Sequence, residues 1–414
     1  MTVCASALPA GAFVRLPLAE RCCCNPRLTD PQRLSMVLPV IATTAAVTAA
    51  VSWMIMSRQA SFAPGACSSL ERFLQSEIVG QQLAIHQMSD AICDHLLKAQ
   101  PDKPLVLSVH GPPGVGKSLS HRLLAQAMYD APGDDLECPG AHCPGYKVLQ
   151  GMDHINAERA QQHWYLKNSV LTHLRKYTDS ILVIEEYDKL DCPTRAILRQ
   201  LITSSGTANV SMDKSVVILE SNLGQLQLHK MLIEAGERSK VTAEEAHNGL
   251  RNLVYNIWSQ GNCESHVDII RMLSAIDFFL PFFPLEASNI QELFTKRLAE
   301  QSAALVRNDA ANLTWSAEVM DFLLSKAYEA GCYPLEGARP VSTIMTRYLT
   351  RALKQWRTRQ EQAELLHKQQ HKAAHPGLQG SLQRRKKALM AKLSRPVRQV
   401  QLHVDHDNQA LKIV

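Results

Sequence analysis

A glycine-rich loop between an apolar run and a segment with helical spacing constrains the fold more than any other feature of this sequence. The run PLVLSVH at 104–110 contains the branched apolar residues that are typical of a buried strand. The loop GPPGVGKS at 111–118 matches the pattern GxxxxGK(S/T), and HRLLAQAMY then follows with helical spacing. Strand, loop and helix in this order predict a phosphate-binding loop in an α/β domain, with helices on both faces of a parallel sheet.

The residue types in this loop indicate how it would hold a nucleoside triphosphate. Its glycines let backbone N–H groups curl around the β- and γ-phosphates, and the next helix adds its positive dipole end. Lys117 is expected to reach phosphate oxygens, and the Ser118 hydroxyl is expected to ligate Mg²⁺. The candidate ATP-binding residues of the loop are Gly111, Pro112, Pro113, Gly114, Val115, Gly116, Lys117 and Ser118.

Two further apolar runs end in polar residues. ILVIEEYDKL at 181–190 predicts a strand buried on both faces that carries Glu185 and Glu186 at its carboxyl end. Glu185 takes the magnesium-side position, where an aspartate is more usual, and Glu186 takes the position that polarises water. SVVILESN at 215–222 predicts a third strand, whose terminal Asn222 could hold the attacking water by hydrogen bonding. Glu186 and Asn222 are therefore candidate catalytic residues.

Residues 34–56 form an uncharged stretch long enough to span a bilayer as a helix. Four arginines precede it and only Arg58 follows closely, so the positive-inside rule predicts a type II signal anchor. Residues 1–33 would then be cytosolic, and the cysteines at 22–24 would be candidates for palmitoylation. The chain after about residue 57 would lie on the opposite side of the membrane. The alternative is a transit peptide, because the first 33 residues are rich in Ala and Arg.

Composition is that of a globular protein, with 46% hydrophobic and 20% charged residues. The positive charge is concentrated late in the chain, where residues 351–400 hold 13 Lys and Arg against 2 Asp and Glu. No aromatic residues interleave the RRKK cluster at 384–387, which favours a solvated helix or disordered insertion over a nucleic-acid site. The eleven cysteines show no spacing typical of a disulfide framework, and Cys138 and Cys143 favour a local disulfide or free thiols over zinc.

Taken together, these motifs resemble the AAA+ superfamily and, within it, the torsins, over about residues 68–350. IVGQQLA at 78–84 is similar to the adenine-side segment of Clp and torsin modules, which implies nucleotide contacts from Ile78 and Gly80. ESNLG at 220–224 resembles the sensor-1 region, and IDFFLPFFPLE at 276–286 resembles a torsin pattern. The resemblance implies an oligomeric ATPase of the endoplasmic reticulum lumen and nuclear envelope that remodels protein or membrane assemblies.

The chain departs from torsins near its C-terminus and in its loop. GARPV at 337–341 resembles the sensor-2 motif of Clp proteins, with Arg339 placed to touch the γ-phosphate, whereas torsins more often have Gly-Cys-Lys. Ser118 is likewise Clp-like, because torsins commonly carry asparagine there. VRQVQLHVDHDNQALKIV at 397–414 predicts two strands around a turn, similar to the closing hairpin of a Clp-type small domain.

Clp proteins place an arginine just before the Ile-Asp pair, so that one subunit completes the site of its neighbour. This chain has Ala275 there, and Arg271 lies four positions earlier, about one helical turn away. Torsins also lack this arginine, and the resemblance implies a membrane-bound activator that supplies it. An enzyme without it is expected to be slow alone, since an arginine supplied in trans contributes about 10³–10⁵ in rate in related chemistry.

The expected organisation is a large AAA+ domain at 68–284 and a smaller, mainly helical domain at 285–414 with a basic insertion and a terminal β-hairpin. The leading function is a torsin-like, membrane-anchored ATPase that acts on protein clients. One alternative is a Clp-like chaperone or disaggregase of a mitochondrion or plastid, although no aromatic-glycine loop of the kind that grips a threaded polypeptide lies between Tyr146 and Tyr165. Another is an ATP-binding scaffold with little hydrolysis, motivated by Glu185 and Ala275.

Overall fold

The residues that the computed structural model describes all belong to the unit that runs from Arg58 to the C-terminus. Within this described part of the chain, no helix has the length and apolar character needed to cross a membrane. The predicted anchor at 34–56, the cysteines at 22–24 and the RRKK cluster at 384–387 lie outside the described residues. The structure describes residues 62–130, 143–151, 159–204, 206–207, 210–261, 263–329, 337–374 and 397–414.

A five-stranded parallel sheet forms the centre of the large domain. The three strands predicted from sequence are its central neighbours, in the order β3, β6 and β1, and their residues are almost all buried. In the register, Leu107 pairs with Ile218 on one side and with Phe278 on the other. In sheet order the strands are β2 (Tyr146–Gln150), β3 (Ile181–Glu185), β6 (Val216–Ser221), β1 (Leu105–His110) and β7 (Phe278–Pro281).

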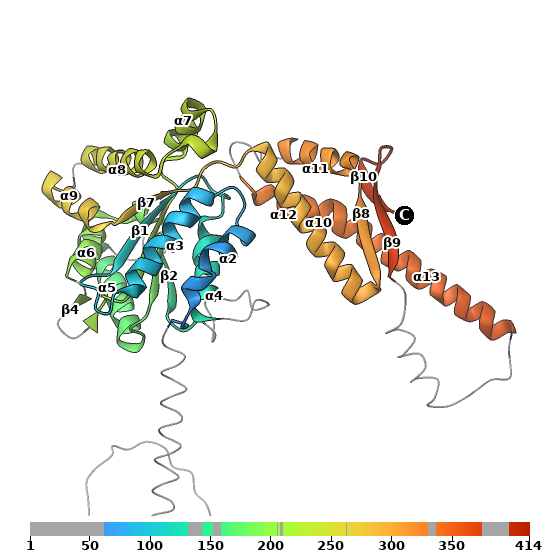
Figure 1. Ribbon diagram of the computed structural model, residues 1–414, viewed down its shortest axis with the longest axis horizontal. Coiled ribbons are helices and arrows are strands. Elements are labelled where there is room, and N and C mark those ends of the chain that lie inside the picture. Colours follow the sequence, from blue (N-terminus) through green and yellow to red (C-terminus); the bar gives the residue numbers. More distant parts are fainter. Residues whose placement is uncertain are drawn as a thin grey trace, which may run out of the picture. The chain divides into compact units, whose positions relative to one another are not determined.

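Helices cover both faces of this sheet, as the sequence predicts (Figure 1). Alternate residues of β1 belong to different cores: Leu107 packs with α2, α3 and α4, and Val106 packs with α5, α6, α8 and α9. A strand buried on both faces needs apolar residues at every position, which explains the unbroken apolar runs. The helices are α2 (Leu70–Glu77), α3 (Gln82–Leu97), α4 (Lys117–Tyr129), α5 (Arg159–Lys176), α6 (Cys192–Thr203), α7 (Gln225–Ala235), α8 (Ala243–Gln260) and α9 (His266–Ala275).

The small domain combines helices with a three-stranded sheet. The predicted hairpin is confirmed, because β9 and β10 pair antiparallel on either side of the turn at 406–409. A third strand, β8, was not predicted, and it pairs parallel with β9. The elements are α10 (Ala287–Asp309), β8 (Ala311–Trp315), α11 (Ala317–Glu329), α12 (Arg339–Ile344), a π-helical segment (Met345–Thr350), α13 (Arg351–Ala374), β9 (Arg398–Asp405) and β10 (Ala410–Ile413).

The basic segment begins as the helix α13. Trp356 on its first turns packs into the core, whereas the side chains at 361–370 are exposed. This exposure agrees with the predicted solvated helix for the part of the segment that the structure describes. A short antiparallel pair, β4 (Gly206–Thr207) and β5 (Val210–Ser211), completes the list of strands in the described residues.

Two disulfides in which both cysteines are described contradict the expectation that the cysteines form no disulfide framework. Cys67 is bonded to Cys93 on α3, with their Cα atoms 5.7 Å apart. Cys192 at the start of α6 is bonded to Cys263 just before α9, with their Cα atoms 6.2 Å apart. The paired cysteines lie 26 and 71 residues apart in the sequence, so only the tertiary fold brings them together.

A polar network inside the sheet makes stability depend on pH. Ser108 Oγ lies 2.7 Å from His110 Nε2 and 2.9 Å from the Tyr187 hydroxyl, and all three side chains are buried. Burial lowers the pKa of His110 to about 3 from 6.5. The unfolded chain therefore binds a proton below pH 6.5 that the folded chain excludes until the pH approaches 3. Stability is lost as the pH falls through this window.

We therefore expect His110 to contribute a loss of about 1.4 kcal/mol in the free energy of unfolding between pH 7.5 and pH 5.5. Urea unfolding of residues 58–414 at both pH values measures this loss. His110→Asn should unfold more easily overall but should show a smaller difference between the two pH values, since every other histidine is unchanged. An equal difference in both proteins would contradict the assignment.

Candidate nucleotide site

The glycine-rich loop connects β1 to α4 and closes around the start of that helix. Gly116, just before α4, has φ 104°, a left-handed conformation that favours glycine. A Cβ atom at Gly111 would overlap the carbonyl of Phe282 after β7, so the close approach of these two segments also requires glycine. The predicted order of strand, loop and helix is thus confirmed, and α4 begins at Lys117.

Lys117 lies at the centre of the site and is only 4% exposed. Its Nζ donates to the carbonyls of Gly111 and Pro112 and to Asn222 Oδ1, each at 2.9 Å. Burial lowers the pKa of the Lys117 amine, and the nearby Glu220 carboxylate opposes this shift. The contact between Lys117 and Asn222 joins the loop to the end of β6.

Glu185 and Glu186 stand at the carboxyl end of β3, where the sequence places them. Glu186 is half-buried and has φ 52°, which is uncommon for a residue other than glycine. Strained backbone of this kind is frequent at functional sites. Glu185 Oε2 accepts a hydrogen bond from Gln150 Nε2 at 3.2 Å. Both glutamates line the same cleft as Lys117.

Two side chains at this site were not predicted from sequence, Glu220 and His121. Glu220 lies on β6 and accepts a hydrogen bond from the Ser118 hydroxyl at 3.0 Å. His121 lies on α4, with Nε2 at 3.3 Å from both Glu185 Oε1 and Glu220 Oε2. A glutamate in an otherwise apolar strand, and a histidine four residues after Lys117 on the same helix, were signals available in the sequence.

The charges of this cluster are strongly coupled. Burial alone would lower the pKa of His121, but the two glutamates raise it above its ordinary value. The close contact with His121 Nε2, at 3.3 Å, in turn lowers the pKa of Glu185. The Ser118 hydroxyl and the carboxylates of Glu185 and Glu220 are oxygen donors of the kind that Mg²⁺ prefers, so these residues fit that ion.

These residues line a cleft of about 470 Å³. This volume is within the usual range for small-molecule sites. The backbone N–H of Ala338 donates to the Gly114 carbonyl at 2.8 Å, which holds the GARPV segment against the loop. The cleft is lined by Glu77, Ile78, Val79, Pro113, Gly114, Val115, Gly116, Lys117, Ser118, Leu119, Gln150, Glu185, Glu186, Glu220, Asn222, Leu285, Leu293, Ala338 and Arg339.

Most of the predicted site residues therefore meet in one place. Gly111 and Pro112 lie behind the cleft, where their carbonyls hold Lys117. Gly80 is not among the described residues that line the cleft, and its carbonyl accepts a hydrogen bond from the Arg238 guanidinium instead. Ile78 does line the cleft, together with its neighbour Val79.

At the position where Clp proteins carry an arginine, this chain has a buried alanine, Ala275. Ala275 ends α9 and is 9% exposed. Arg271 on the same helix is 70% exposed at its side chain and lies 3.9 Å from Asp268. Of the arginines in the described part of the chain, Arg339 is the one that lines the cleft.

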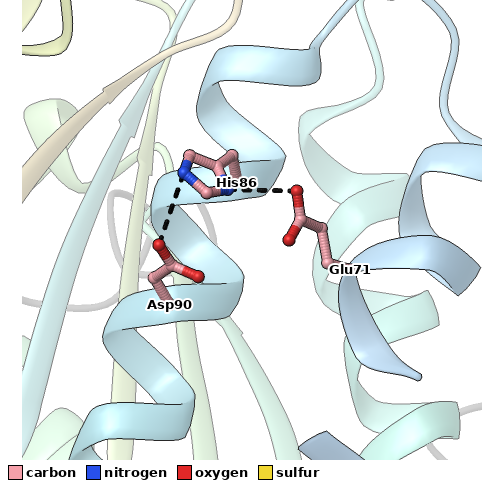
Figure 2. A group of neighbouring side chains, drawn as sticks. All are labelled: Glu71, His86 and Asp90. Atoms are coloured by element: carbon pink, nitrogen blue, oxygen red, sulfur yellow. Dashed lines mark hydrogen bonds and ion pairs between the residues drawn. The ribbon is translucent and has the colours of Figure 1, made fainter. Parts of the chain in front are cut away.

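A second cluster of potential metal ligands lies on the surface formed by α2 and α3. Figure 2 shows His86 between Glu71 and Asp90, with its Nδ1 at 3.0 Å from Glu71 Oε1 and its Nε2 at 3.4 Å from Asp90 Oδ2. The His86 and Asp90 side chains are more than half exposed, and both ring nitrogens already have partners. This arrangement is that of ordinary surface ion pairs, which contribute little to stability.

The parallel sheet, the phosphate loop on β1 and the polar ends of β3 and β6 are consistent with a P-loop AAA+ fold. The family model for Torsin matches residues 59–138. The chaperone protein ClpB of Lactococcus lactis is 27% identical over 292 residues, which cover 69% of this chain and 31% of that protein. ClpB of Bacillus cereus is 26% identical over 290 residues, which cover 67% of this chain and 30% of that protein.

The chain thus spans about a third of the length of these curated relatives. The matches confirm the predicted resemblance to torsin-type AAA+ ATPases related to the Clp proteins.

Proposed function

We propose that this chain is a membrane-anchored ATPase of the endoplasmic reticulum lumen and nuclear envelope that remodels protein or membrane assemblies. One observation carries the proposal. Four separate elements bring Lys117, Glu186, Asn222 and Arg339 to a single cleft beside the phosphate loop. These residues supply the groups that hydrolysis of a phosphoanhydride requires: cations for the phosphates, an amide to hold water and a carboxylate to take its proton.

In the proposed reaction, a water oxygen attacks the γ-phosphorus of ATP while the bond to the β–γ bridging oxygen breaks. The electron pair of that bond leaves with ADP, and the proton of the attacking water passes to Glu186. Asn222 orients the water, while Lys117 and Arg339 offset the negative charge of the phosphates. Ser118 and Glu185 would hold Mg²⁺, which supplies further neutralisation of phosphate charge when it is bound.

A partner is proposed to complete this site in trans. Ala275 has no guanidinium to offer a neighbour, and Arg271, which lies 3.9 Å from Asp268, stands about one helical turn away from that position. A membrane-bound activator that inserts an arginine would supply the missing charge stabilisation. The chain is accordingly proposed to act within a homo- or hetero-oligomer, on protein clients.

The disulfides support placement in the lumen. Disulfides persist in oxidising compartments and are rare in cytosolic proteins. Cys67–Cys93 and Cys192–Cys263 lie after the uncharged stretch at 34–56, on the side that the preceding arginines assign to the lumen. The disulfides and the arginines before residues 34–56 therefore both favour a type II topology with the ATPase body in the lumen.

A Clp-like chaperone is the second candidate. Arg339 in the GARPV segment, the Ser118 hydroxyl and the closing hairpin of β9 and β10 favour it, as do relatives named as ClpB chaperones. This chain matches only about a third of each of those proteins, so their whole activity is not carried over. The ATP-binding scaffold is a third candidate, favoured by the His121 contact that engages Glu185.

Lys117→Ala is expected to weaken ATP binding by at least about 30-fold, because each charge-assisted hydrogen bond to phosphate contributes about 1.5–3 kcal/mol. Equilibrium binding of a fluorescent ATP analogue to the purified full chain measures this change. Lys230→Ala is the matched control, since Lys230 is an exposed lysine on α7 that pairs with Glu234. Equal affinity in all three proteins would rule out the phosphate loop as the nucleotide site.

A further inference from the structure

We infer that His121, Glu185 and Glu220 form a protein-only binding site for a divalent transition-metal ion such as Mn²⁺. This site lies in the cleft of the proposed function, beside the phosphate loop. The inference adds a metal preference to that cleft and rests on the proposed function only for its consequence in catalysis. Because all three ligands come from the chain itself, binding of the ion requires no nucleotide.

The fold brings the three ligands to one edge of the sheet. Ile184 pairs with Leu219 in the parallel register of β3 and β6, so the next residues, Glu185 and Glu220, stand side by side. His121 reaches them from α4, four residues after Lys117. One ligand atom from each of the three residues lies within 4.8 Å of the others.

The distances match those between ligands of a single ion. His121 Nε2 lies 3.3 Å from Glu185 Oε1 and 3.3 Å from Glu220 Oε2. Ligand atoms at about 2.1 Å from an ion are roughly 3.0–3.4 Å apart in octahedral or tetrahedral coordination. Both distances from His121 are thus within this range, and the two carboxylate oxygens lie within 4.8 Å of each other.

The imidazole is held in the orientation that a ligand needs. His121 Nδ1 lies 2.7 Å from the Tyr146 hydroxyl, and burial raises the pKa of this tyrosine, so the hydroxyl stays neutral. With Nδ1 bonded to Tyr146, displacement of the Nε2 proton by a metal ion would leave the Nε2 lone pair directed at the ion between the two carboxylates. His121 is 1% exposed, and its Nε2 makes no hydrogen bond of good geometry. Metal-bound histidines are usually fixed in this way through their other nitrogen.

When no nucleotide phosphate is present, the His121 imidazole makes this donor set suit a transition metal better than Mg²⁺. Mg²⁺ prefers oxygen ligands and is usually held through one or two carboxylates and substrate phosphates, whereas imidazole nitrogen suits Mn²⁺, Fe²⁺ and Zn²⁺ better. Two carboxylates offset the charge of a divalent ion, and the Ser118 hydroxyl, 3.0 Å from Glu220 Oε2, lies at the edge of the same cluster. Binding in the absence of ATP distinguishes this site from an ordinary Mg·ATP site.

The test is a titration of the metal-stripped, nucleotide-free full chain in detergent with Mn²⁺ alone, followed by electron paramagnetic resonance. We expect one Mn²⁺ per chain, with a nitrogen coupling from one imidazole. His121→Gln should weaken binding at least tenfold, because loss of even a supporting residue typically costs 10–100-fold. His86→Gln is the matched control and should bind Mn²⁺ as the wild type does, since His86 lies in the surface cluster.

Absence of nucleotide-free Mn²⁺ binding, or bound Mn²⁺ without nitrogen coupling in the wild-type chain, would overturn the inference. Either result would indicate that a protonated His121 bridges the two carboxylates instead. The wild-type spectrum decides the question even if His121→Gln fails to fold. ATP binding, measured separately on the same preparation, shows whether the proposed function stands when the metal site does not.

Discussion

Glu186→Gln is expected to lower the single-turnover rate of ATP hydrolysis by about 10²–10⁴-fold, the usual contribution of a positioned general base. The amide keeps the size of the side chain and its place at the end of β3, but it cannot accept the proton of the attacking water. ATP affinity should change little, because Lys117 and the loop make the phosphate contacts. Single-turnover hydrolysis of labelled ATP by the full chain measures the rate, and equilibrium binding measures the affinity.

Glu237→Gln provides the matched control for this change. Glu237 is an exposed glutamate that lies 3.6 Å from Lys240, and it does not line the cleft within the described residues. The Glu237→Gln protein should hydrolyse ATP at the rate of the wild type. A Glu186→Gln protein that retained the wild-type rate would remove this residue from the proposed mechanism, and a parallel loss of affinity would assign it to binding instead.

Solubilised endoplasmic reticulum membranes are expected to raise the single-turnover rate of the full chain by about 10³–10⁵-fold, the contribution of an arginine supplied in trans. The isolated chain should be slow, because Ala275 offers no guanidinium and Arg339 is the one arginine at the cleft in the described part. The rise should vanish in the Glu186→Gln protein, which shows that the added hydrolysis comes from this site.

The other outcomes distinguish the alternatives. Fast hydrolysis without membranes would favour the Clp-like chaperone, and loss of that activity in an Arg271→Ala protein would show that the chain supplies its own arginine from α9. Bound ATP without turnover, even with membranes present, would favour the scaffold. An Arg271→Ala protein that responds to membranes as the wild type does would support an arginine from a partner.

The central sheet and its phosphate loop could be predicted because local patterns determine them. Strands buried on both faces leave unbroken apolar runs, and polar residues at their ends mark the edge where a ligand binds. The structure brings two of these predicted residues together at that edge, with Lys117 Nζ 2.9 Å from Asn222 Oδ1. The hairpin of β9 and β10 could also be predicted, since alternating apolar and polar residues flank a turn-forming segment.

The remaining features depend on contacts between distant parts of the chain. β8 is too short to be distinguished from a loop, and only its parallel pairing with β9 makes it a strand. Glu220 was treated as an ordinary residue of an apolar strand, because nothing in that run shows that it faces Ser118 and His121. The disulfides join cysteines up to 71 residues apart, a separation that no spacing rule covers.

A structure of the Glu186→Gln protein determined with ATP and Mg²⁺ tests the central claim most directly, because this change should trap the unhydrolysed nucleotide. The proposal predicts ATP in the cleft, with its γ-phosphate within hydrogen-bond distance of Lys117 Nζ and of the Arg339 guanidinium, and with Asn222 facing the site of the attacking water. A cleft without nucleotide, or a γ-phosphate directed away from Glu186 and Asn222, would contradict it.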